Sequence, residues 1–479
     1  MVKLIPREYQ KTIFENIKNN NSLVSVPTSL GKTLIAFMLA EHQLELYPNK
    51  KVLFLAPTRP LCNQHFESFN QFKSVVMNGL IKQSDRFKLY QENKVIFVTP
   101  QCITSDIKKG LDLNMFSLII FDEAHRNIGD YAYVKIAEEY SKIPNYLILG
   151  MTTSPRRNKT KIKEVCDNLH LTHVESRTNE DEDIKPYIQK TTVETIFIDL
   201  PDELKAISKK LKELFDSDLN GLKKQGYHIN GYKSELLKLQ KEISKQIIIG
   251  VPAYNAAILV AKCMKLSHAI DLIETQSVKS FIKYMTSMLK DTSKSSIALK
   301  YNTQITEALT LADTAKEHPK LQIINNICNN YYNSNNKCKI IIFCKFRNVI
   351  NLIVSSLDVP CCKFIGQASK GLDGGMKQKA QIEAINKFKE GKYNCLVCSQ
   401  VAEEGISVPD VDLIIMQTPA QSAISSIQRK GRTGRSSRGK VINIVTKDTS
   451  DMYIYYSTIR KEKNMKNTLD NINKQQTLK

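Results

Sequence analysis

Short apolar runs alternate with longer amphipathic stretches from the start of the chain to residue 155. Each run is bounded by polar or turn-forming residues, and sequence that can form a helix follows it. Runs that are apolar throughout are typical of strands buried on both faces, and their alternation with helices indicates a parallel sheet. The pattern predicts an α/β domain with strands at 22–26, 51–57, 94–100, 117–123 and 146–152.

The same pattern returns in the C-terminal part of the chain without repeating the sequence of the first block. Its apolar runs cover residues 339–344, 394–399, 411–417 and 439–445. A shared pattern with unrelated sequence indicates two separate α/β domains rather than one large sheet.

Strand character is lost between these blocks, from about residue 200 to 315, where Lys and Leu recur at helical spacing. Residues 201–300 hold 17 Lys, no Arg and 10 acidic residues, a net charge of +7. Such an excess suits a helical module that grips phosphates, although solvated helix faces would give the same composition. The expected domains are therefore 1–198, 199–316 (the helical insertion) and 317–479.

The composition of the whole chain favours a polyanionic partner. Lys and Arg number 69 against 48 Asp and Glu, a formal net charge of +21. This balance favours nucleic acid first and an anionic membrane surface second, while lysines spread over solvated faces are the plainer alternative. No apolar run is long enough to span a bilayer and no signal peptide is evident. We expect an intracellular protein without a membrane partner, cytoplasmic in a prokaryote or nuclear in a eukaryote.

The eleven cysteines are expected to be structural thiols in a reducing compartment. Cys395 and Cys398 have the spacing of metal ligands, but they lie in an apolar run that predicts a buried strand. Alternation along a strand would turn the two thiols to opposite faces, and no second pair has a matching spacing. Cys361 and Cys362 are adjacent, which suits neither chelation nor an ordinary disulfide.

The segment after the first predicted strand, VPTSLGKT, has the ending of a phosphate-binding loop. Backbone N–H groups at the start of a helix would hold the phosphates, Lys32 would reach the β and γ oxygens, and Thr33 would hold Mg²⁺. Val26 stands where the usual pattern begins with glycine. The residues expected to bind ATP here are Pro27, Thr28, Ser29, Leu30, Gly31, Lys32 and Thr33.

A second acidic motif, DEAH, follows another apolar strand at residues 122–125. The carboxyl end of a parallel strand lies at the crevice where such sheets bind ligands. Asp122 is expected to ligate Mg²⁺ through water, and Glu123 to orient and deprotonate the attacking water.

The third motif, QRKGRTGR at residues 428–435, lies in the second α/β block. Arg432 and Arg435 are spaced one turn apart on a predicted helix, so both would project from one face. Two fixed guanidiniums could stabilise the charge that develops on a γ-phosphate. The alternative for such a basic helix is contact with a nucleic-acid backbone, which suits Arg429 and Lys430. If ATP lies between the domains, binding would close the cleft and hydrolysis would open it.

Taken together and in this order, the motifs resemble those of superfamily 2 helicases, including two RecA-like domains. Within that superfamily the chain resembles the Hef, Fanconi anaemia group M and Mph1 type over essentially its whole length. The discriminating stretches are FDEAHRNIGDYAYVKIA, HAIDLIETQSVKSFIKYM, GQASKG and PAQSAISSIQRKGRTGRSSRGKV.

This resemblance implies an ATP-dependent motor acting on forked and Holliday-type DNA, with a thumb-like helical insertion. Gln10 would read the adenine edge beside Arg7, Gln428 would contact the phosphates or the attacking water, and Gly405 belongs to the nucleotide-coupling motif. A solvated helix position is the alternative for Gln10, and loop capping is the alternative for Thr58, Arg59 and Gln101. The implied DNA contacts are Thr58, Arg59, Thr99 and Gln101 in the first domain and Lys345, Gly366 and Gln367 in the second.

Three departures from the family pattern bear on coupling. The usual P-T-G stands as Pro27-Thr28-Ser29, T-A-S as Thr152-Thr153-Ser154, and G-L-D as Gly405-Ile406-Ser407. The last change removes a carboxylate that often contacts the ribose or an arginine. Since Lys32 and both DEAH carboxylates remain, an active ATPase is expected. The nuclease motif of some relatives is not found after residue 450, so fork cleavage would need a separate nuclease partner.

Two other functions remain open. Antiviral RNA-sensing helicases share the motif set and a helical insertion, which leaves an RNA-directed helicase as one alternative. An ATP-gated clamp that binds repair partners without hydrolysis is the other, because the three departures could impair turnover.

Overall fold

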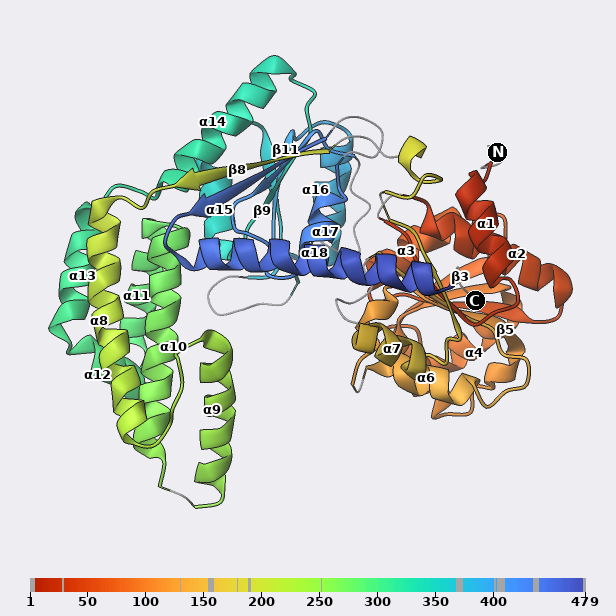
Figure 1. The fold of residues 1–479 in the computed structure, drawn as a ribbon, viewed down its shortest axis with the longest axis horizontal. Coiled ribbons are helices and arrows are strands. Elements are labelled where there is room, and N and C mark those ends of the chain that lie inside the picture. The colour runs from red at the N-terminus through yellow and green to blue at the C-terminus, as the bar shows by residue number, and fades with distance from the viewer. Residues whose placement is uncertain are drawn as a thin grey trace.

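The computed structural model describes residues 5–27, 30–129, 131–153, 159–178, 180–187, 191–250, 252–367, 374–399, 402, 410–433 and 439–476. For residue 159 and for 466–476 it describes the backbone only. These residues form two parallel sheets, each with its own helices, and a group of helices packed against the second sheet (Figure 1). The α/β class and the helical insertion expected from the sequence are confirmed.

The first sheet contains seven parallel strands in the order β3-β4-β2-β5-β6-β1-β7. Helices α1, α2 and α3 cover one face and α4 to α7 the other, because each contributes apolar side chains to the core on its own side. The strands are β1 (Ser22–Ser25), β2 (Lys51–Leu55), β3 (Ser74–Met77), β4 (Val95–Val98), β5 (Phe116–Phe121), β6 (Ile148–Thr152) and β7 (His173–Ser176). The helices are α1 (Glu8–Ile17), α2 (Lys32–Leu46), α3 (Arg59–Ser68), α4 (Gln83–Glu92), α5 (Pro100–Ile107), α6 (Ala132–Tyr140) and α7 (Lys159–Asn168).

The second sheet contains six parallel strands in the order β10-β11-β9-β12-β13-β8. Helices α14 and α15 cover one face, and α16 packs on the other. The strands are β8 (Thr191–Ile198), β9 (Ile340–Phe343), β10 (Cys361–Phe364), β11 (Cys395–Cys398), β12 (Leu413–Met416) and β13 (Gly439–Thr446). The helices are α14 (Pro319–Ser334), α15 (Arg347–Ser356), α16 (Gln378–Lys389), α17 (Ala423–Lys430) and α18 (Ser450–Gln476).

All nine predicted strands are present, and the four that the sequence pattern did not reveal are β3, β7, β8 and β10. These four are the edge strands of the two sheets. An edge strand is less enclosed than a central one and needs no continuous apolar run, so the pattern used to find the others fails there.

Strand β8 corrects the expected boundary of the first domain at residue 198. It pairs with β13 along its whole length, from Thr191 opposite Gly439 to Ile198 opposite Thr446. Ile196 and Ile198 face the core formed with α14, while Phe197 lies on the other face beside Tyr455. The strand therefore belongs to the second sheet, and the boundary falls before residue 191.

Six helices form the insertion, and their apolar residues recur at helical spacing. On α8, for example, Leu204, Ile207, Leu211 and Leu214 are buried against α10, α11 and α13. Helix α9 packs on the other end of α8 and α10 through Leu236, which leaves it as an arm of the module (Figure 1). The helices are α8 (Asp202–Lys224), α9 (Lys233–Ile248), α10 (Tyr254–Thr275), α11 (Val278–Lys290), α12 (Lys294–Lys300) and α13 (Thr303–Thr314).

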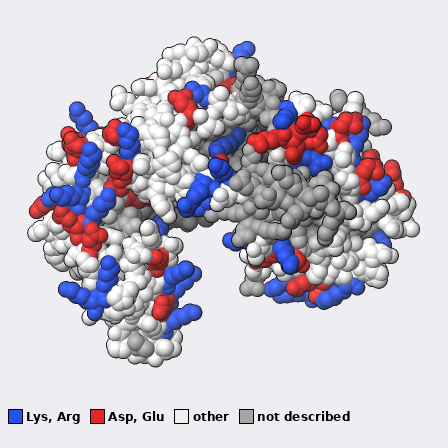
Figure 2. Space-filling model, in the orientation of Figure 1, with Lys and Arg blue, Asp and Glu red and all other residues white. Residues whose placement is uncertain are grey.

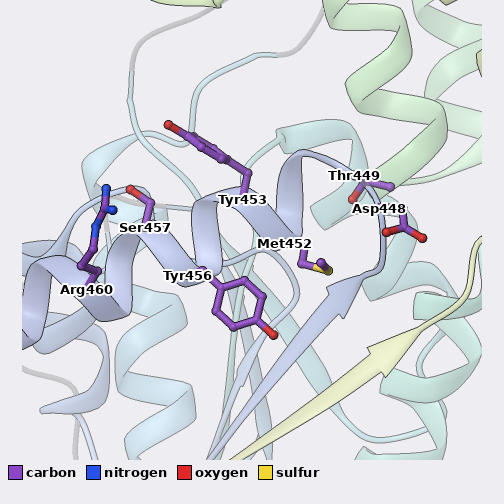
Figure 3. A pocket seen from close by; sticks show the side chains of 7 residues that line it. All are labelled: Asp448, Thr449, Met452, Tyr453, Tyr456, Ser457 and Arg460. Atoms are coloured by element: carbon purple, nitrogen blue, oxygen red, sulfur yellow. The ribbon is translucent and has the colours of Figure 1, made fainter.

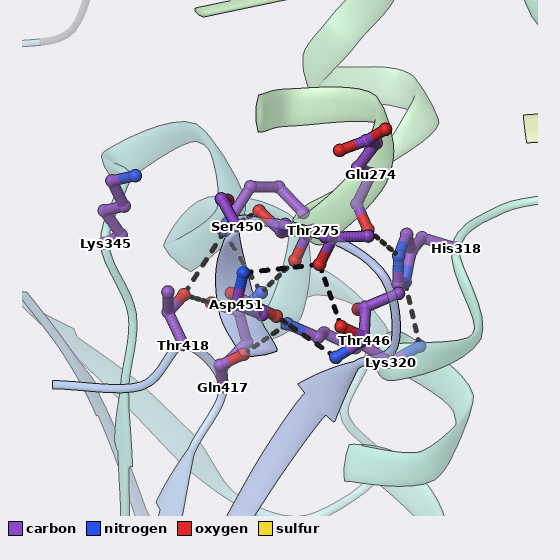
Figure 4. A network of polar contacts seen from close by, with 12 residues as sticks. Glu274, Thr275, His318, Lys320, Lys345, Gln417, Thr418, Thr446, Ser450 and Asp451 are labelled. Carbon is purple, nitrogen blue, oxygen red and sulfur yellow. Dashed lines mark hydrogen bonds and ion pairs between the residues drawn. The ribbon is translucent and has the colours of Figure 1, made fainter. Parts of the chain in front are cut away.

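Buried polar contacts join the insertion to the second sheet (Figure 4). Lys320 is completely buried, donates to the Gln417 carbonyl at 2.9 Å and forms an ion pair with the Asp451 carboxylate. The ring of His318 bonds the Glu274 carbonyl at the end of α10, at 3.0 Å. We call Lys320, Asp451, His318 and their bonded neighbours the junction cluster.

Helix α18 begins in the junction cluster, packs on α17 and β13, and reaches β7 of the first sheet (Figure 1). Lys430 and Glu462 form an ion pair between α17 and α18 at 2.8 Å. On another side of the helix, Tyr453, Tyr456 and Arg460 line a shallow pocket of about 440 Å³ (Figure 3). Within the described residues no helix combines the length and apolarity that crossing a bilayer requires.

The positions of the cysteine side chains agree with the strand pattern of the sequence. Cys395 and Cys398 contribute to the cores on opposite faces of the second sheet. All eleven cysteines are free, and nine of them are buried. Burial raises the pKa of the Cys344 thiol to about 12, which favours an inert apolar side chain.

Candidate functional site

The predicted motifs of the first domain converge because its strands are parallel. The segments that follow β1, β2, β4 and β5 all begin at the same edge of the sheet, and these strands are close together in its order. This edge holds Lys32 and Thr33 after β1, Thr58 and Arg59 after β2, Thr99 and Gln101 after β4, and Asp122 and Glu123 after β5.

The phosphate-loop motif has the local geometry that its sequence predicts. Gly31 has a φ of +73° and immediately precedes α2, which begins at Lys32. A Cβ at residue 31 would lie 2.4 Å from Nε2 of Gln10, so both the conformation and the space require glycine. The Lys32 ammonium donates to the Val26 carbonyl at 3.0 Å. Thr28 and Ser29, both expected to bind ATP, lie outside the described residues.

Gln10 is only 3% exposed, which excludes the solvated alternative. Its amide nitrogen donates to the carbonyl of Leu30 at 3.2 Å, and its amide oxygen accepts from the backbone N–H of Arg7 at 2.8 Å. Tyr9 donates to the same Leu30 carbonyl at 2.5 Å. The Arg7 guanidinium lies 4.5 Å from the ring centre of Tyr187. These side chains hold the phosphate loop, and the adenine contact of Arg7 and Gln10 stays a prediction.

Asp122 lies at the end of β5 and is 5% exposed. Its Oδ2 accepts a hydrogen bond from Nε2 of His65 at 2.9 Å, and the other ring nitrogen of His65 lies 3.5 Å from the Thr33 hydroxyl. Burial by itself would raise the pKa of Asp122, but His65 and Lys32 outweigh it and the pKa is lowered. The carboxylate is therefore ionised although it is buried.

Glu123 adopts a left-handed backbone conformation, with φ +50°, which is uncommon for a residue other than glycine. Its carboxylate lies 3.2 Å from Nδ1 of His125, and the same nitrogen lies 3.0 Å from the Thr152 hydroxyl. Glu123 is thereby connected to the end of β6. Ser154, the last residue of that motif, lies outside the described residues.

Two of the predicted nucleic-acid contacts directly precede helices. Thr58 precedes α3 and Thr99 precedes α5, and neither side chain caps its helix. The Thr58 hydroxyl oxygen is buried without a hydrogen-bond partner. Arg59 is partly exposed and Gln101 exposed. The loop-capping alternative is therefore not observed for Thr58, while contact with nucleic acid stays a prediction for all four residues.

The contacts predicted in the second domain are engaged within the protein. Lys345 forms an ion pair with Asp271 of α10, the structural partner that the sequence did not suggest. The Gly366 carbonyl accepts from Arg347 at 3.1 Å, and Gln367 donates to Gln381 at 3.3 Å. Any contact of Lys345 with a phosphate would have to compete with the Asp271 carboxylate.

The structure corrects the expectation for the arginine motif. Helix α17 ends at Lys430 and Gly431 terminates it, so Arg432 lies beyond the helix. The Arg432 carbonyl accepts from the Val411 N–H at 3.3 Å, which places this segment alongside the start of β12. Gly431 is the C-cap of the helix, and glycine has a low helix propensity. Arg435 and Gly405 lie outside the described residues.

Two basic residues of α17 are not available to a nucleic-acid backbone as expected. Arg429 is 2% exposed, donates to the Thr418 carbonyl at 3.3 Å and lies over the Phe343 ring. Lys430 is paired with Glu462. Gln428 is also buried, on the helix that Figure 1 places on the side of the second sheet nearer the first.

His65 belongs to this site although no sequence motif indicates it. A histidine six residues into a helix carries no motif of its own, and its contacts depend on how α3 packs over the end of β5. Tyr133 of α6 was missed for the same reason, although its hydroxyl donates to the Asp122 carbonyl at 2.8 Å.

Comparison with known proteins matches three family models to this organisation. The model of the type III restriction enzyme res subunit matches residues 3–157, and the helicase conserved C-terminal domain matches 319–437. Residues 203–319 match a model for the helical bundle of ATP-dependent RNA helicases. The three matches follow the first sheet, the second sheet and the helical insertion.

Individual relatives match over nearly the whole chain. A Methanocaldococcus jannaschii protein named as an ATP-dependent RNA helicase is 36% identical, over 97% of this chain and 61% of its own length. The ATP-dependent DNA helicase MPH1 of Pyricularia oryzae is 31% identical, over 92% of this chain and 43% of its own length. The crystal structure of the Pyrococcus furiosus Hef helicase domain has a TM-score of 0.71 and 37% identity, covering 95% of this chain and 98% of that one.

The paired sheets and the phosphate-loop and DEAH motifs, together with these matches, define an ATP-dependent helicase. More narrowly, the chain belongs to the superfamily 2 helicases of the Hef, Fanconi anaemia group M and Mph1 type. It spans less than two thirds of the length of the curated relatives described above.

Proposed function

We propose that this chain is an ATP-hydrolysing motor that moves along DNA and remodels forked or branched DNA during replication-fork repair. The observation that carries the proposal is the meeting of Lys32, Thr33 and Asp122 with the nucleic-acid candidates at one edge of the first sheet. The name of the Pyricularia oryzae relative supports DNA as the track. Repair partners belong to the same proposal.

Each residue of the ATP site has a role that its position supports. Lys32, at the first position of α2, would bind the β and γ phosphates, and the backbone N–H groups of the loop would surround them. Glu123 would orient the attacking water and take its proton. Arg432 and Arg435, with Gln428, would approach from the second lobe and stabilise the charge on the transferred phosphoryl group.

The donors at this site fit Mg²⁺. Thr33 supplies a hydroxyl and Asp122 an ionised carboxylate, and Mg²⁺ in nucleotide sites takes a few protein oxygens together with phosphate oxygens. When bound, Mg²⁺ would offset the charge of the phosphates during transfer. Among the described residues no group of three or more His, Cys, Asp or Glu could hold a metal by itself, which agrees with a site that the nucleotide completes.

The helical insertion would hold the duplex part of a fork. Many of its lysines are paired with carboxylates, for example Lys262 with Asp218, and Figure 2 shows both signs of charge mixed on the visible face of the module. Helix α9 exposes four lysines together with one glutamate, Glu242, on the arm that Figure 1 draws nearest the first lobe: Lys233, Lys238, Lys241 and Lys245. This arm supports the phosphate-gripping alternative over uniformly solvated faces.

The deciding experiment is ATP hydrolysis measured with a DNA fork, a linear DNA duplex and an RNA duplex of equal length. We expect the fork to stimulate hydrolysis most, and a Lys32→Ala variant to show none of the stimulation. A branch-migration assay on the same fork distinguishes a motor from an ATPase that does not move DNA. Raising the salt concentration should weaken fork binding steeply, because each phosphate contact releases counterions.

An RNA-directed helicase is the second candidate, and the name of the Methanocaldococcus jannaschii relative favours it. Stimulation by the RNA duplex equal to or greater than stimulation by the fork would reject the DNA assignment. The non-hydrolysing clamp is tested by Glu123→Gln. For a motor, this change abolishes turnover and leaves ATP binding intact, whereas a clamp shows background turnover before the change as well.

A further inference from the structure

His65 is held rigidly where α3 passes the end of β5. The side chain is buried, and its ring lies 4.4 Å from that of Phe54 at a tilt of 34°. Phe54 is itself packed against Phe69 and Phe97, with ring centres 5.7 and 5.1 Å away. An imidazole stacked on such a cluster has little freedom to change rotamer, so its two nitrogens keep fixed directions.

The two nitrogens of His65 connect the two residues expected to hold Mg²⁺. A carboxylate can only accept a hydrogen bond, so the contact of 2.9 Å to Asp122 makes Nε2 the donor. In the neutral ring Nδ1 is then an acceptor, and the Thr33 hydroxyl, 3.5 Å away, donates its hydrogen to it. This direction leaves the lone pairs of the Thr33 oxygen and the second oxygen of Asp122 for a cation and its water.

The helix that carries His65 also carries predicted DNA contacts. Thr58 and Arg59 stand at the N-terminal end of α3, and His65 follows two turns later. The helix has ten residues, about 15 Å in length, and Cys62 in its middle is buried with its thiol directed at the Ala56 carbonyl. A short, well-packed helix moves as one body, so a shift at Arg59 reaches His65.

We propose that His65 is a positioning residue that transmits DNA binding at the start of α3 to Asp122 and Thr33, and thereby sets how strongly DNA stimulates ATP hydrolysis. This inference rests on the proposed function, because it takes Thr58 and Arg59 to contact DNA. Binding there fixes α3, α3 fixes the imidazole, and the imidazole fixes both oxygen donors. Contacts behind metal ligands of this kind typically change metal affinity or activity by about 10–100-fold when they are removed.

The test compares two variants of His65 with a control on the same helix. His65→Leu removes both hydrogen bonds while keeping an apolar side chain. His65→Gln keeps an N–H donor that can reach Asp122, but its acceptor oxygen does not occupy the ring position of Nδ1 that faces Thr33. Cys62→Ala shortens a buried side chain of α3 whose thiol is directed at the Ala56 carbonyl, so it reports any loss that comes from loosening the helix.

The unfolding temperature and the fork affinity without nucleotide are measured on each protein. The ATPase kcat and KM are measured with and without the fork. The last measurement is the Mg²⁺ concentration that gives half-maximal binding of a non-hydrolysable ATP analogue. For His65→Leu we expect the ratio of stimulated to basal kcat to fall about tenfold and the Mg²⁺ requirement to rise about tenfold. Fork affinity and KM should stay within about twofold. His65→Gln should recover part of both effects, and Cys62→Ala should keep the original ratio.

Two results would overturn the proposal. One is a fall of basal and stimulated kcat by the same factor in His65→Leu, since that would confine His65 to the ATP site. The other is an equal loss of stimulation in Cys62→Ala. If RNA rather than DNA stimulates the unchanged protein, the DNA assignment fails and the same ratio measured with RNA decides the role of His65. If neither polymer stimulates it, both proposals fail.

Discussion

Two clusters of buried charge lie in different parts of this molecule and are neutralised in different ways. In the junction cluster, Lys320 and Asp451 are 0% and 1% exposed and pair directly with each other. At the edge of the first sheet, Asp122 is 5% exposed and its hydrogen-bond partner is an imidazole, while the Lys32 ammonium donates to a backbone carbonyl. The first cluster pairs its two charges directly, whereas the second lies at the sheet edge where the phosphate-loop and DEAH motifs meet.

The pKa values of the two carboxylates point the same way. Burial raises the pKa of Asp451, and Lys320 offsets that effect only in part. Burial also acts to raise the pKa of Asp122, but His65 and Lys32 more than compensate and the pKa is lowered. Their surroundings therefore favour the ionised form of Asp122 more strongly than that of Asp451. The comparison teaches that burial of a charge does not by itself mark a functional site, since the Lys320–Asp451 pair is as deeply buried as Asp122 and carries none of the predicted motifs.

The largest effect is expected from breaking the junction pair. Lys320→Met leaves the Asp451 carboxylate buried without its cation, and losses of this kind are about 3–5 kcal/mol. The double variant Lys320→Met, Asp451→Leu should recover most of that loss, because an apolar pair avoids the cost of burying two charges. Urea unfolding of the three proteins measures both changes. A double variant as unstable as the single one would mean that the pair itself stabilises the junction.

Asp122→Asn should have the opposite signature. We expect ATPase kcat to fall about 10²–10³-fold, as when a group that stabilises transition-state charge is removed. The urea midpoint should stay close to that of the unchanged protein, since the amide oxygen can still accept from His65. If stability falls as far as in Lys320→Met, the distinction between the two clusters is wrong.

Strands and site residues could be predicted where they follow from the local sequence. They could not be predicted where they depend on packing between helices and strands. The nine central strands were predictable because burial on both faces demands an apolar run, and the edge strands β3, β7, β8 and β10 were not. Asp122 was expected beside the phosphate loop of Lys32, and the two lie at the same edge of the sheet because both segments come after parallel strands.

The residues whose role depends on packing could not be foreseen. His65 contacts Asp122 because of the angle at which α3 crosses β5, and Lys345 meets Asp271 because the insertion docks on the second sheet. Arg432 was expected on a helix because the two arginines are spaced one turn apart. The helix ends earlier, at Lys430, so this spacing does not place both side chains on one helical face. The periodicity of a sequence predicts helices and strands, whereas the contacts between them depend on how they pack.

The pH dependence of stability sharpens the contrast from the side of the junction. Burial, helped by Lys320, lowers the pKa of His318 to about 3, against about 6.5 for an unfolded histidine. Below pH 6.5 His318 is protonated in the unfolded chain but not in the folded one. Its contribution to the free energy of unfolding is therefore fully present above that pH and is lost as the pH drops toward 3. Between pH 7 and 5 this histidine should cost about 2 kcal/mol.

His318→Gln isolates that contribution, because glutamine can keep a donor for the Glu274 carbonyl and does not titrate. Urea unfolding at pH 7, 6 and 5 should show a shallower loss in the variant than in the unchanged protein. Equal slopes would show that the imidazole is protonated in the fold or that the junction opens before unfolding.

The smallest effect concerns Lys345, a predicted DNA contact that is already engaged within the protein. Lys345 and Asp271 are each only partly shielded, with side chains 17% and 16% exposed, and the pKa of Asp271 is lowered by Lys345 in spite of burial. If DNA phosphate competes with Asp271 for this ammonium, Asp271→Asn should tighten fork binding and Lys345→Ala should weaken it, each by about 1 kcal/mol or less. The salt dependence of log Kd separates the explanations. Lys345→Ala should reduce its slope by about one if the lysine reaches a phosphate, and an unchanged slope in both variants would make the pair part of the junction cluster rather than of the DNA site.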